Sequence, residues 1–235
     1  MGITDTAIER LRALIVNGEL APGARLPPEP ELAAQLGISR GSVREAVRAL
    51  THARMLSVRR GDGTYVTSLE PDQLLQSISF AAELARNETV LDVVEVRRVL
   101  EPGATRLAAE RISERELNEL SELLDEMDQL EDAEAFIGLD VEFHNRIIEA
   151  TGNSWLTAIL RGLAEPTIRA RRQRLDADHD AVTETTHRQH REIYQALREH
   201  DGALAEAAAL AHVCSTQRGV KTVLGRASST RTTLT

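Results

Sequence analysis

Apolar residues recur at helical spacing along most of the chain, and one short alternating segment interrupts that pattern in its first third. Two short amphipathic stretches come first, with apolar positions at Leu32, Ala33 and Leu36 and then at Val43, Val47 and Leu50. Gly37, between them, permits the tight turn that reverses the chain. Beyond Met55 the pattern becomes that of a β-hairpin around a Gly61-Asp62-Gly63 turn. The order helix, turn, helix, hairpin predicts a winged helix-turn-helix.

Arginines accompany these elements. Arg40, Arg44 and Arg48 are spaced by one helical turn beside the apolar face, so they stay in solvent and can reach phosphates or the acceptor edge of guanine. Arg59 and Arg60 enter the hairpin turn. On an isolated helix such a stripe is more often only a solvated face. Its place in this order favours binding to double-stranded DNA, and hence gene regulation over catalysis.

Two capping signals compete for the start of the second helix. Ser39 is a good N-cap candidate, whereas Ser42 with Glu45 makes a capping box slightly later. The pattern alone leaves the start open by a few residues.

From Pro71 to about Gly219 the chain is predicted to be all helical. Ser113 and Glu116 make a capping box for one of these helices. The expected helices are 90–111, 113–130, 133–150, 155–175, 181–200 and 203–218. The fold class is therefore mainly α. Its predicted domains are a winged helix-turn-helix over residues 1–68, a linker at 69–72, a helical bundle over 73–219 and a flexible tail over 220–235.

Length and charge agree with two domains, since 235 residues usually divide into two compact units. Residues 1–68 carry 9 basic and 7 acidic side chains, a net of +2, and the remainder carries 19 and 30, a net of −11. DNA contact must therefore be local to the first domain.

Aromatic residues are only 3% of the chain, which argues against a stacking platform for single-stranded nucleic acid. One cysteine, no signal-peptide core and no membrane-length apolar run predict a cytoplasmic protein without membrane contact.

The first domain resembles the GntR family of bacterial transcription regulators, on residues 18–27 (GELAPGARLP) and 39–46 (SRGSVREA). The resemblance implies that Arg40 and Arg44 contact bases or phosphates and that Gly61 lets the wing approach the minor groove. The predicted DNA-binding residues are Arg40, Ser42, Arg44, Arg48, Arg60 and Gly61. Two positions depart from the family pattern. Pro30 stands where an arginine is usual, which removes one anchor, and Arg54 stands where a glycine commonly ends the recognition helix.

The helical part resembles the FCD domain, the effector-binding domain of the FadR subfamily. The resemblance rests on residues 95–102 (EVRRVLEP), 107–111 (LAAER), 140–144 (DVEFH) and 190–197 (HREIYQAL), and on Ala211-His212. Asp140 and His144 are one helical turn apart, and His190 and His212 come from later helices. Each histidine alone is more often a core or surface residue, but the family match at all four positions implies a metal site. Three nitrogens and one oxygen suit Zn²⁺, Ni²⁺, Mn²⁺ or Fe²⁺.

Arg97 falls where the subfamily often has an arginine pointing into the same cavity. Beside a metal, its guanidinium would bind a small organic acid. The alternative is a surface salt bridge with Glu101 at the next turn. The later arginines, Arg169, Arg171, Arg172 and Arg174, are expected to form a solvated or interface face, because their surroundings are acidic.

These features predict a homodimeric transcription factor, most often a repressor in this family, that binds palindromic operator DNA and responds to an organic acid. A metal-dependent enzyme on the helical domain is the main alternative. Against it, no separate general base is identifiable beside the predicted ligands. In a third possibility the helical domain only dimerises and receives no small molecule.

Overall fold

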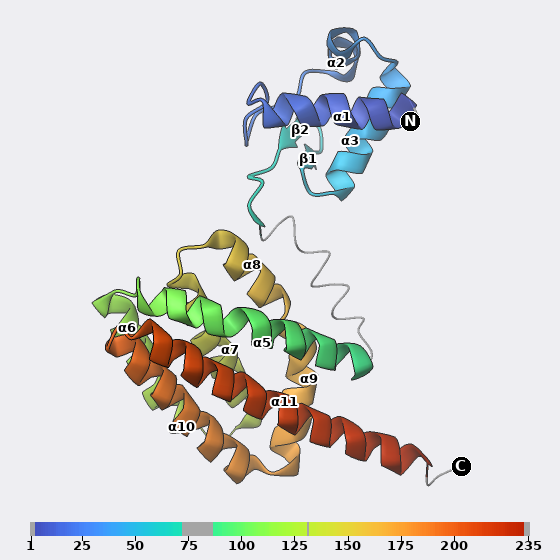
Figure 1. Ribbon diagram of the computed structural model, residues 1–235. Helices are drawn as coiled ribbons and strands as arrows, with labels where there is room; N and C mark the ends of the chain where they lie inside the picture. The colour runs from blue at the N-terminus through green and yellow to red at the C-terminus, as the bar shows by residue number, and fades with distance from the viewer. Residues whose placement is uncertain (1–2, 72–86, 131, 233–235) are drawn as a thin grey trace. The chain divides into compact units, whose positions relative to one another are not determined.

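The computed structural model describes residues 3–71, 87–130 and 132–232. The chain divides into two compact units, residues 1–74 and 75–235, each with its own buried core (Figure 1). Residues 69–71 of the linker predicted at 69–72 are described, whereas the helix expected after Pro71 falls largely on residues 72–86, outside the described residues.

The first unit is a winged helix-turn-helix, as the sequence predicts. Its elements are α1 (Ile3–Val16), α2 (Glu29–Leu36), α3 (Arg40–His52), β1 (Leu56–Arg59) and β2 (Gly63–Val66). The strands are antiparallel, with Leu56 opposite Val66 and Arg59 opposite Gly63. The core is closed by apolar side chains of every element, among them Leu11, Leu32 and Leu50. Burial of these side chains is what fixes α3 against α1 and leaves its arginine face in solvent.

Local signals set the ends of the two short helices. Gly37 ends α2 in the left-handed conformation, at φ 62°. Ser39 is the N-cap of α3, and its hydroxyl accepts a hydrogen bond from the amide of Ser42 at 3.1 Å. The earlier of the two predicted starts is therefore the one used. Arg54, at the position of the missing glycine, also has a positive φ of 59°, so an arginine adopts here the conformation that glycine accepts at lower cost.

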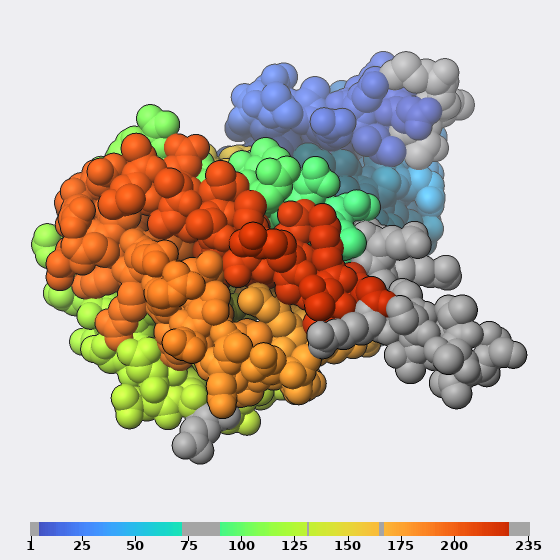
Figure 2. All heavy atoms as spheres, turned by 60° about the horizontal axis from the view of Figure 1, so that its bottom comes forward, coloured from blue at the N-terminus to red at the C-terminus, as the bar shows by residue number. Residues whose placement is uncertain are grey.

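The second unit is a helical bundle. Its described helices are α5 (Asn87–Ala109), α6 (Glu114–Met127), α7 (Ala133–Glu149), α8 (Ser154–Gly162), α9 (Glu165–Ala177), α10 (His179–Arg198) and α11 (Gly202–Thr232). The large fully buried side chains of α6, α7 and α10 fill its centre, among them Leu120, Phe143 and Ile193. α11 lies beside both α5 and α10 (Figures 1 and 2). In Figure 2 a small hollow opens between α11 and the orange residues of α9 and α10.

Two helix boundaries differ from the sequence prediction. The single helix expected over residues 155–175 is two helices, because the chain breaks at Leu163 and Ala164 and Pro166 stands in the first turn of α9, where its missing N–H costs nothing. The helix expected to end near Arg218 continues to Thr232. Val220 is fully buried with Val90 and Ala170, and Leu224 packs against them, so apolar burial stabilises the first turns of this extension. Residues 220–232 are thus helical and continuous with the rest of α11.

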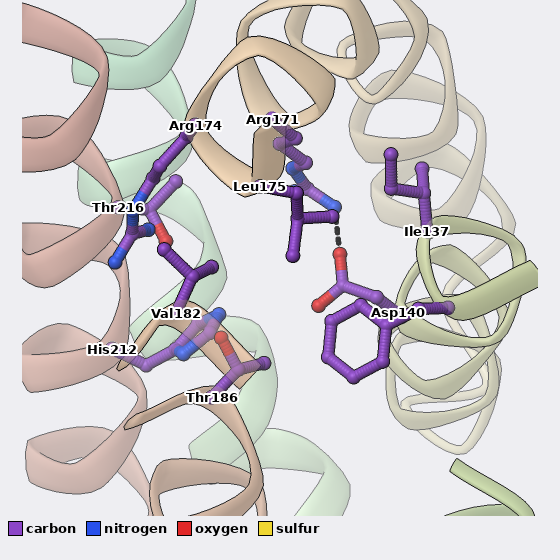
Figure 3. Close-up of a pocket in the computed structure, with 10 residues that line it drawn as sticks. Ile137, Asp140, Arg171, Arg174, Leu175, Val182, Thr186, His212 and Thr216 are labelled. Carbon is purple, nitrogen blue, oxygen red and sulfur yellow. Dashed lines mark hydrogen bonds and ion pairs between the residues drawn. The ribbon is translucent and has the colours of Figure 1, made fainter. Parts of the chain in front are cut away.

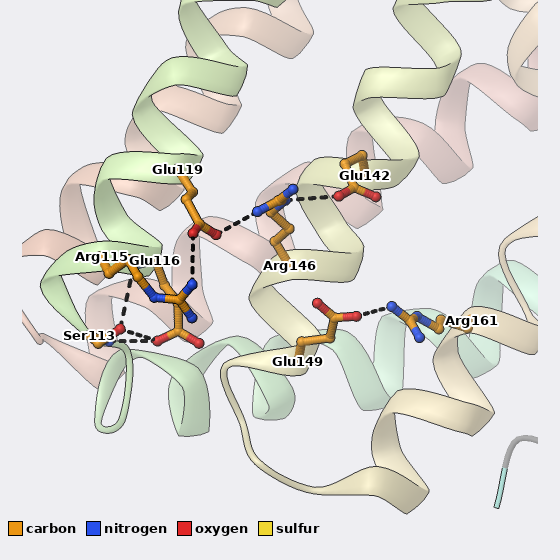
Figure 4. A network of polar contacts seen from close by, with 8 residues as sticks. All are labelled: Ser113, Arg115, Glu116, Glu119, Glu142, Arg146, Glu149 and Arg161. Carbon is orange, nitrogen blue, oxygen red and sulfur yellow. Dashed lines mark hydrogen bonds and ion pairs between the residues drawn. The ribbon is translucent and has the colours of Figure 1, made fainter.

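Polar contacts fix the relative positions of α6, α7 and α8. The predicted capping box of Ser113 and Glu116 is present at the start of α6. Arg146 of α7 donates to Glu119 of α6 at 2.5 Å and to Glu142 at 2.8 Å (Figure 4). Arg161 of α8 pairs in the same way with Glu149 of α7. Asn153 caps α8. These contacts hold α7, which carries two of the predicted metal ligands.

Candidate functional site

The outer face of α3 presents Arg40, Arg44 and Arg48, all exposed. Arg44 donates from Nε and Nη2 to Oε2 of Glu29 at 3.2 and 3.0 Å, so α2 holds this guanidinium beside the recognition helix. Arg48 pairs with Glu45 at 2.9 Å. At these exposures, 56% for Arg44 and 67% for Arg48, the pairs contribute little stability and leave the arginines available to another anion.

Ser42 differs from the other residues of the predicted DNA-binding set. Only 7% of it is exposed, and its hydroxyl lies 2.8 Å from that of Ser39. Pro30 lies exposed in the first turn of α2, where a proline is tolerated but offers no donor to DNA. The position that usually carries an arginine therefore contributes no cation.

The wing is held by side-chain contacts that sequence reasoning missed. Arg25 donates to the carbonyl of Asp62, and its guanidinium occupies the space where a Cβ at position 63 would lie, 2.7 Å from Nε. Tyr65 donates to the Asp62 carboxylate at 2.9 Å, and Arg59 lies over the Tyr65 ring at 4.2 Å. The predicted contact residues Arg60 and Gly61 are exposed at the tip of this braced hairpin.

The second candidate site is inside the bundle. Asp140 and His144 of α7, His190 of α10 and His212 of α11 each offer one ligand atom, and these four atoms lie within 4.8 Å of one another. His190 is fully buried, and Asp140 and His212 are 7% and 5% exposed. The sequence predicted this set, and the fold brings all four members together.

Hydrogen bonding leaves the ring nitrogens of this cluster free for a ligand. His144 Nε2 and both nitrogens of His190 are buried and have no hydrogen-bond partner among the described residues. His212 uses Nδ1, 3.1 Å from the Gln189 side-chain oxygen, which leaves its Nε2 free. Oδ1 of Asp140 lies 3.4 Å from His190 Nε2 and 3.8 Å from His144 Nε2. Unpaired buried polar atoms are costly, and an ion between them would satisfy them.

Charge states in the cluster suit a metal ion. Burial lowers the pKa of His190 to about 4 and lowers the pKa of His144 and His212 well below the usual range. Burial acts to raise the pKa of Asp140, but Arg171 and the neighbouring histidines together hold it well below the ordinary value. The protein thus presents three neutral imidazoles and one carboxylate at neutral pH, the forms that coordinate metal.

Arg171 corrects one prediction. The arginines of α9 were expected to form a solvated or interface face, and Arg169 and Arg172 are indeed exposed. Arg171 is 8% exposed and donates from Nη1 to Oδ2 of Asp140 (Figure 3). Its ion pair turns the other oxygen of Asp140 toward the histidines. Arg174 is half-buried on the same side of the helix, one turn further on.

Arg97 of α5 is only 3% exposed. Its Nε donates to Glu101 at 2.5 Å and its Nη1 to the Thr167 hydroxyl at 3.0 Å. The salt bridge with Glu101 that was the alternative prediction is present, but it is buried rather than on the surface.

Comparison with known proteins gives the family. Residues 3–66 match the model described as bacterial regulatory proteins, gntR family, and residues 92–214 match the FCD domain. The chain belongs to the GntR family of bacterial regulators and carries an FCD domain. Both family resemblances are thereby confirmed, and the regulator binds DNA through its winged helix-turn-helix unit.

Three similar proteins extend this result. The HTH-type transcriptional regulator LutR of Bacillus subtilis is 34% identical over 208 residues, covering 87% of this chain and 94% of its own length. The galactonate operon transcriptional repressor of Escherichia coli is 29% identical, covering 94% and 97%. The solved structure of Streptococcus agalactiae GntR superposes with a TM-score of 0.67 at 32% identity, covering 92% of this chain and 99% of its own. The first two relatives are named as transcriptional regulators, which decides for a regulator over the enzyme alternative. In the part of the chain that the structure describes, no helix is long and apolar enough to cross a bilayer.

The residues of this regulator that sequence reasoning missed around the cluster are Arg171, Arg174 and Gln189. A weak signal existed for the first two, since they are three residues apart and lie between the apolar residues Ala170 and Leu175 on the same helical face. Gln189, next to a predicted ligand, carried no signal of its own.

Proposed function

We propose that this regulator is a homodimeric repressor that binds a palindromic operator, and that a small organic acid at a metal site in the FCD domain changes its DNA affinity. The observation that carries the proposal is the buried set of Asp140 and three histidines with free ring nitrogens. The name of one relative supports it, because galactonate is an organic acid.

Recognition of the operator rests on the exposed arginines of α3 and on the wing. Replacing Arg44 by Ala should cost about 1–3 kcal/mol on the operator if Arg44 reads a guanine, and less on random DNA of the same length. Arg12→Ala is the matched control, because it removes one exposed arginine from α1 of the same unit. Equal losses on both DNAs would assign Arg44 to phosphate contact alone, and an unchanged operator affinity of the Arg40→Ala, Arg44→Ala double variant would overturn the assignment of α3.

A dimer is proposed because one winged unit makes few base contacts, and two linked units multiply affinity and specificity. Light scattering at micromolar protein should give twice the mass of the 25.9 kDa chain, alone and on operator DNA. A monomer in both states would refute this part of the proposal.

The metal would be held by Asp140, His144, His190 and His212. It would supply a positive charge with coordination positions open to a carboxylate. The residues contribute the rest: Arg171 keeps Asp140 ionised and turned toward the imidazoles, and Gln189 orients His212. Elemental analysis and calorimetry should find about one divalent ion per chain in the wild type and in His52→Ala, a change at an exposed histidine outside the cluster, and a loss of binding in His212→Ala. Equal metal content in wild type and His212→Ala, or none in either after divalent ions are added back, would remove the site.

Arg97 is proposed to orient the acid. A coupling free energy of about 1–3 kcal/mol between binding of the acid and binding of DNA would change operator affinity roughly 5- to 150-fold. Arg97→Gln should keep the metal and lose the response. Because Arg97 is also half of a buried ion pair, Glu101→Gln is the matched control: it removes the same pair and keeps the guanidinium. If both variants respond equally, Arg97 has no role beyond the ion pair. A wild type that holds metal but responds to no acid would favour a domain that only dimerises.

A further inference from the structure

A small cavity extends from the histidine cluster between α7, α9, α10 and α11 (Figure 3). The centres of water-sized spheres can occupy about 30 Å³ of it, so only a compact ligand would fit. Asp140 and His212 form one part of its wall, and Arg171 and Arg174 enter from α9. Thr186 and Thr216 add hydroxyl groups to walls that are otherwise apolar.

Arg174 is the cation of this cavity without a partner. It makes no hydrogen bond or ion pair with any of the residues that the structure describes, whereas Arg171 is paired with Asp140. Burial lowers the pKa of Arg174, which marks a guanidinium that has lost part of its water. Nε of Arg171 is also buried without a partner among the described residues. The unpaired N–H donors of these two neighbouring guanidinium groups can bind an anion.

Gly219 of α11 makes room for the Arg174 side chain. A Cβ at position 219 would lie 2.4 Å from Nε of Arg174, 2.6 Å from Cδ and 2.8 Å from Cζ. A glycine inside a helix costs about 0.5–1 kcal/mol relative to alanine. The space it leaves here is filled by the charged side chain of Arg174, which also lines the cavity.

The formal charges around the cavity favour a ligand with more than one anionic group. Arg97 and Glu101 neutralise each other, while Arg171 and Arg174 exceed Asp140 by one positive charge. A divalent metal at the cluster raises the excess to three. One carboxylate on the metal would still leave Arg174 without an anion.

We propose that the effector is a compact dicarboxylate, with one acid group at the histidine cluster and the second bound by Arg174. The inference rests on the proposed function, because it takes the metal and an acid effector as given. It adds a second binding subsite, assigns Arg174 as the cation of that subsite and names dicarboxylates as the class of acid. Selectivity follows from charge, since a monocarboxylate can occupy only one of the two subsites at a time.

The test is calorimetry on the full-length zinc-loaded protein with malonate, succinate, acetate and propionate. The wild type should bind one of the dicarboxylates at least about 10-fold more tightly than either monocarboxylate. Arg174→Gln should lower that dicarboxylate affinity by about 10- to 100-fold and leave the monocarboxylate affinity unchanged. Gly219→Ala should do the same without removing a charge, because the added methyl displaces the guanidinium.

Gly225→Ala is the matched control, since it is the same change on the same helix with open space around the new methyl. Elemental analysis should find equal zinc in all four proteins. Dicarboxylate binding that survives in Arg174→Gln, an equal loss of both classes of acid, or no binding to the zinc-loaded wild type would overturn the second subsite. A wild type that takes up no zinc would instead overturn the metal site, and the same titration of zinc-free protein would still test Arg174 by its selective loss.

Discussion

The ion pair between Arg171 and Asp140 should be a large local contribution to the stability of the helical unit. Both side chains are about nine-tenths buried, at 9% and 10% exposure. Arg171→Met keeps most of the volume and leaves the carboxylate of Asp140 facing neutral imidazoles. Removal of one partner from a buried pair costs about 3–5 kcal/mol. With a urea m value of about 2 kcal/mol/M, the midpoint should fall by roughly 1.5–2.5 M.

The measurement is urea unfolding of chelator-treated protein at pH 7, followed by fluorescence. Trp155 is the sole tryptophan and lies in α8, so the signal reports the helical unit. Arg172→Met is the control, because Arg172 is the next residue and its pair with Glu134 is on the surface. That change should cost at most about 1 kcal/mol.

A double-mutant cycle isolates the pair. Asp140→Asn alone leaves the guanidinium of Arg171 buried without its counter-ion and should also destabilise. The double variant of Asp140→Asn and Arg171→Met should be much more stable than the sum of the two losses implies, because no uncompensated charge remains. Losses that add to within about 0.5 kcal/mol would show that the two residues do not interact, and the reasoning about the ligand's orientation would fail with them.

Three further changes probe other features. The chelator-treated helical unit should lose up to about 3 kcal/mol of stability as the pH falls from about 6.5 toward 4. The reason is that His190, with its pKa lowered to about 4, stays neutral in the folded protein while the same residue in the unfolded chain takes up a proton. A thermal midpoint that is constant across this pH window would contradict the lowered pKa. Arg54→Gly should raise the free energy of unfolding of the first unit by about 1 kcal/mol, since it relieves a positive φ, and lower stability by circular dichroism would count against that strain. Ser113→Ala should cost the helical unit about 1 kcal/mol in urea unfolding through loss of the capping box, and no loss would mean that Glu116 alone caps α6.

The sequence determined what depends on neighbours along the chain. Gly37 and Ser39 set the turn before α3 through local backbone geometry, and apolar spacing chose the buried face of each short helix. One helical turn between Asp140 and His144 already placed both on one side of α7. The family motifs added His190 and His212, which spacing alone could not connect to them.

Tertiary structure decided what depends on partners distant in sequence. Arg171 and Arg172 are adjacent and chemically identical, but one is buried against Asp140 and the other is exposed, because the packing of α9 against α7 selects a single face. Arg97 and Glu101 are one helical turn apart, a spacing that ion pairs have on surface helices and in cores alike, so the sequence does not reveal that this pair is buried. Its burial depends on the helices that cover α5. The continuation of α11 past Gly219 follows from the contacts of Val220, and the space at Gly219 is defined only by Arg174 of another helix. Helix periodicity predicts which face of each segment is apolar, but only the packing of the helices decides which residues that face contacts.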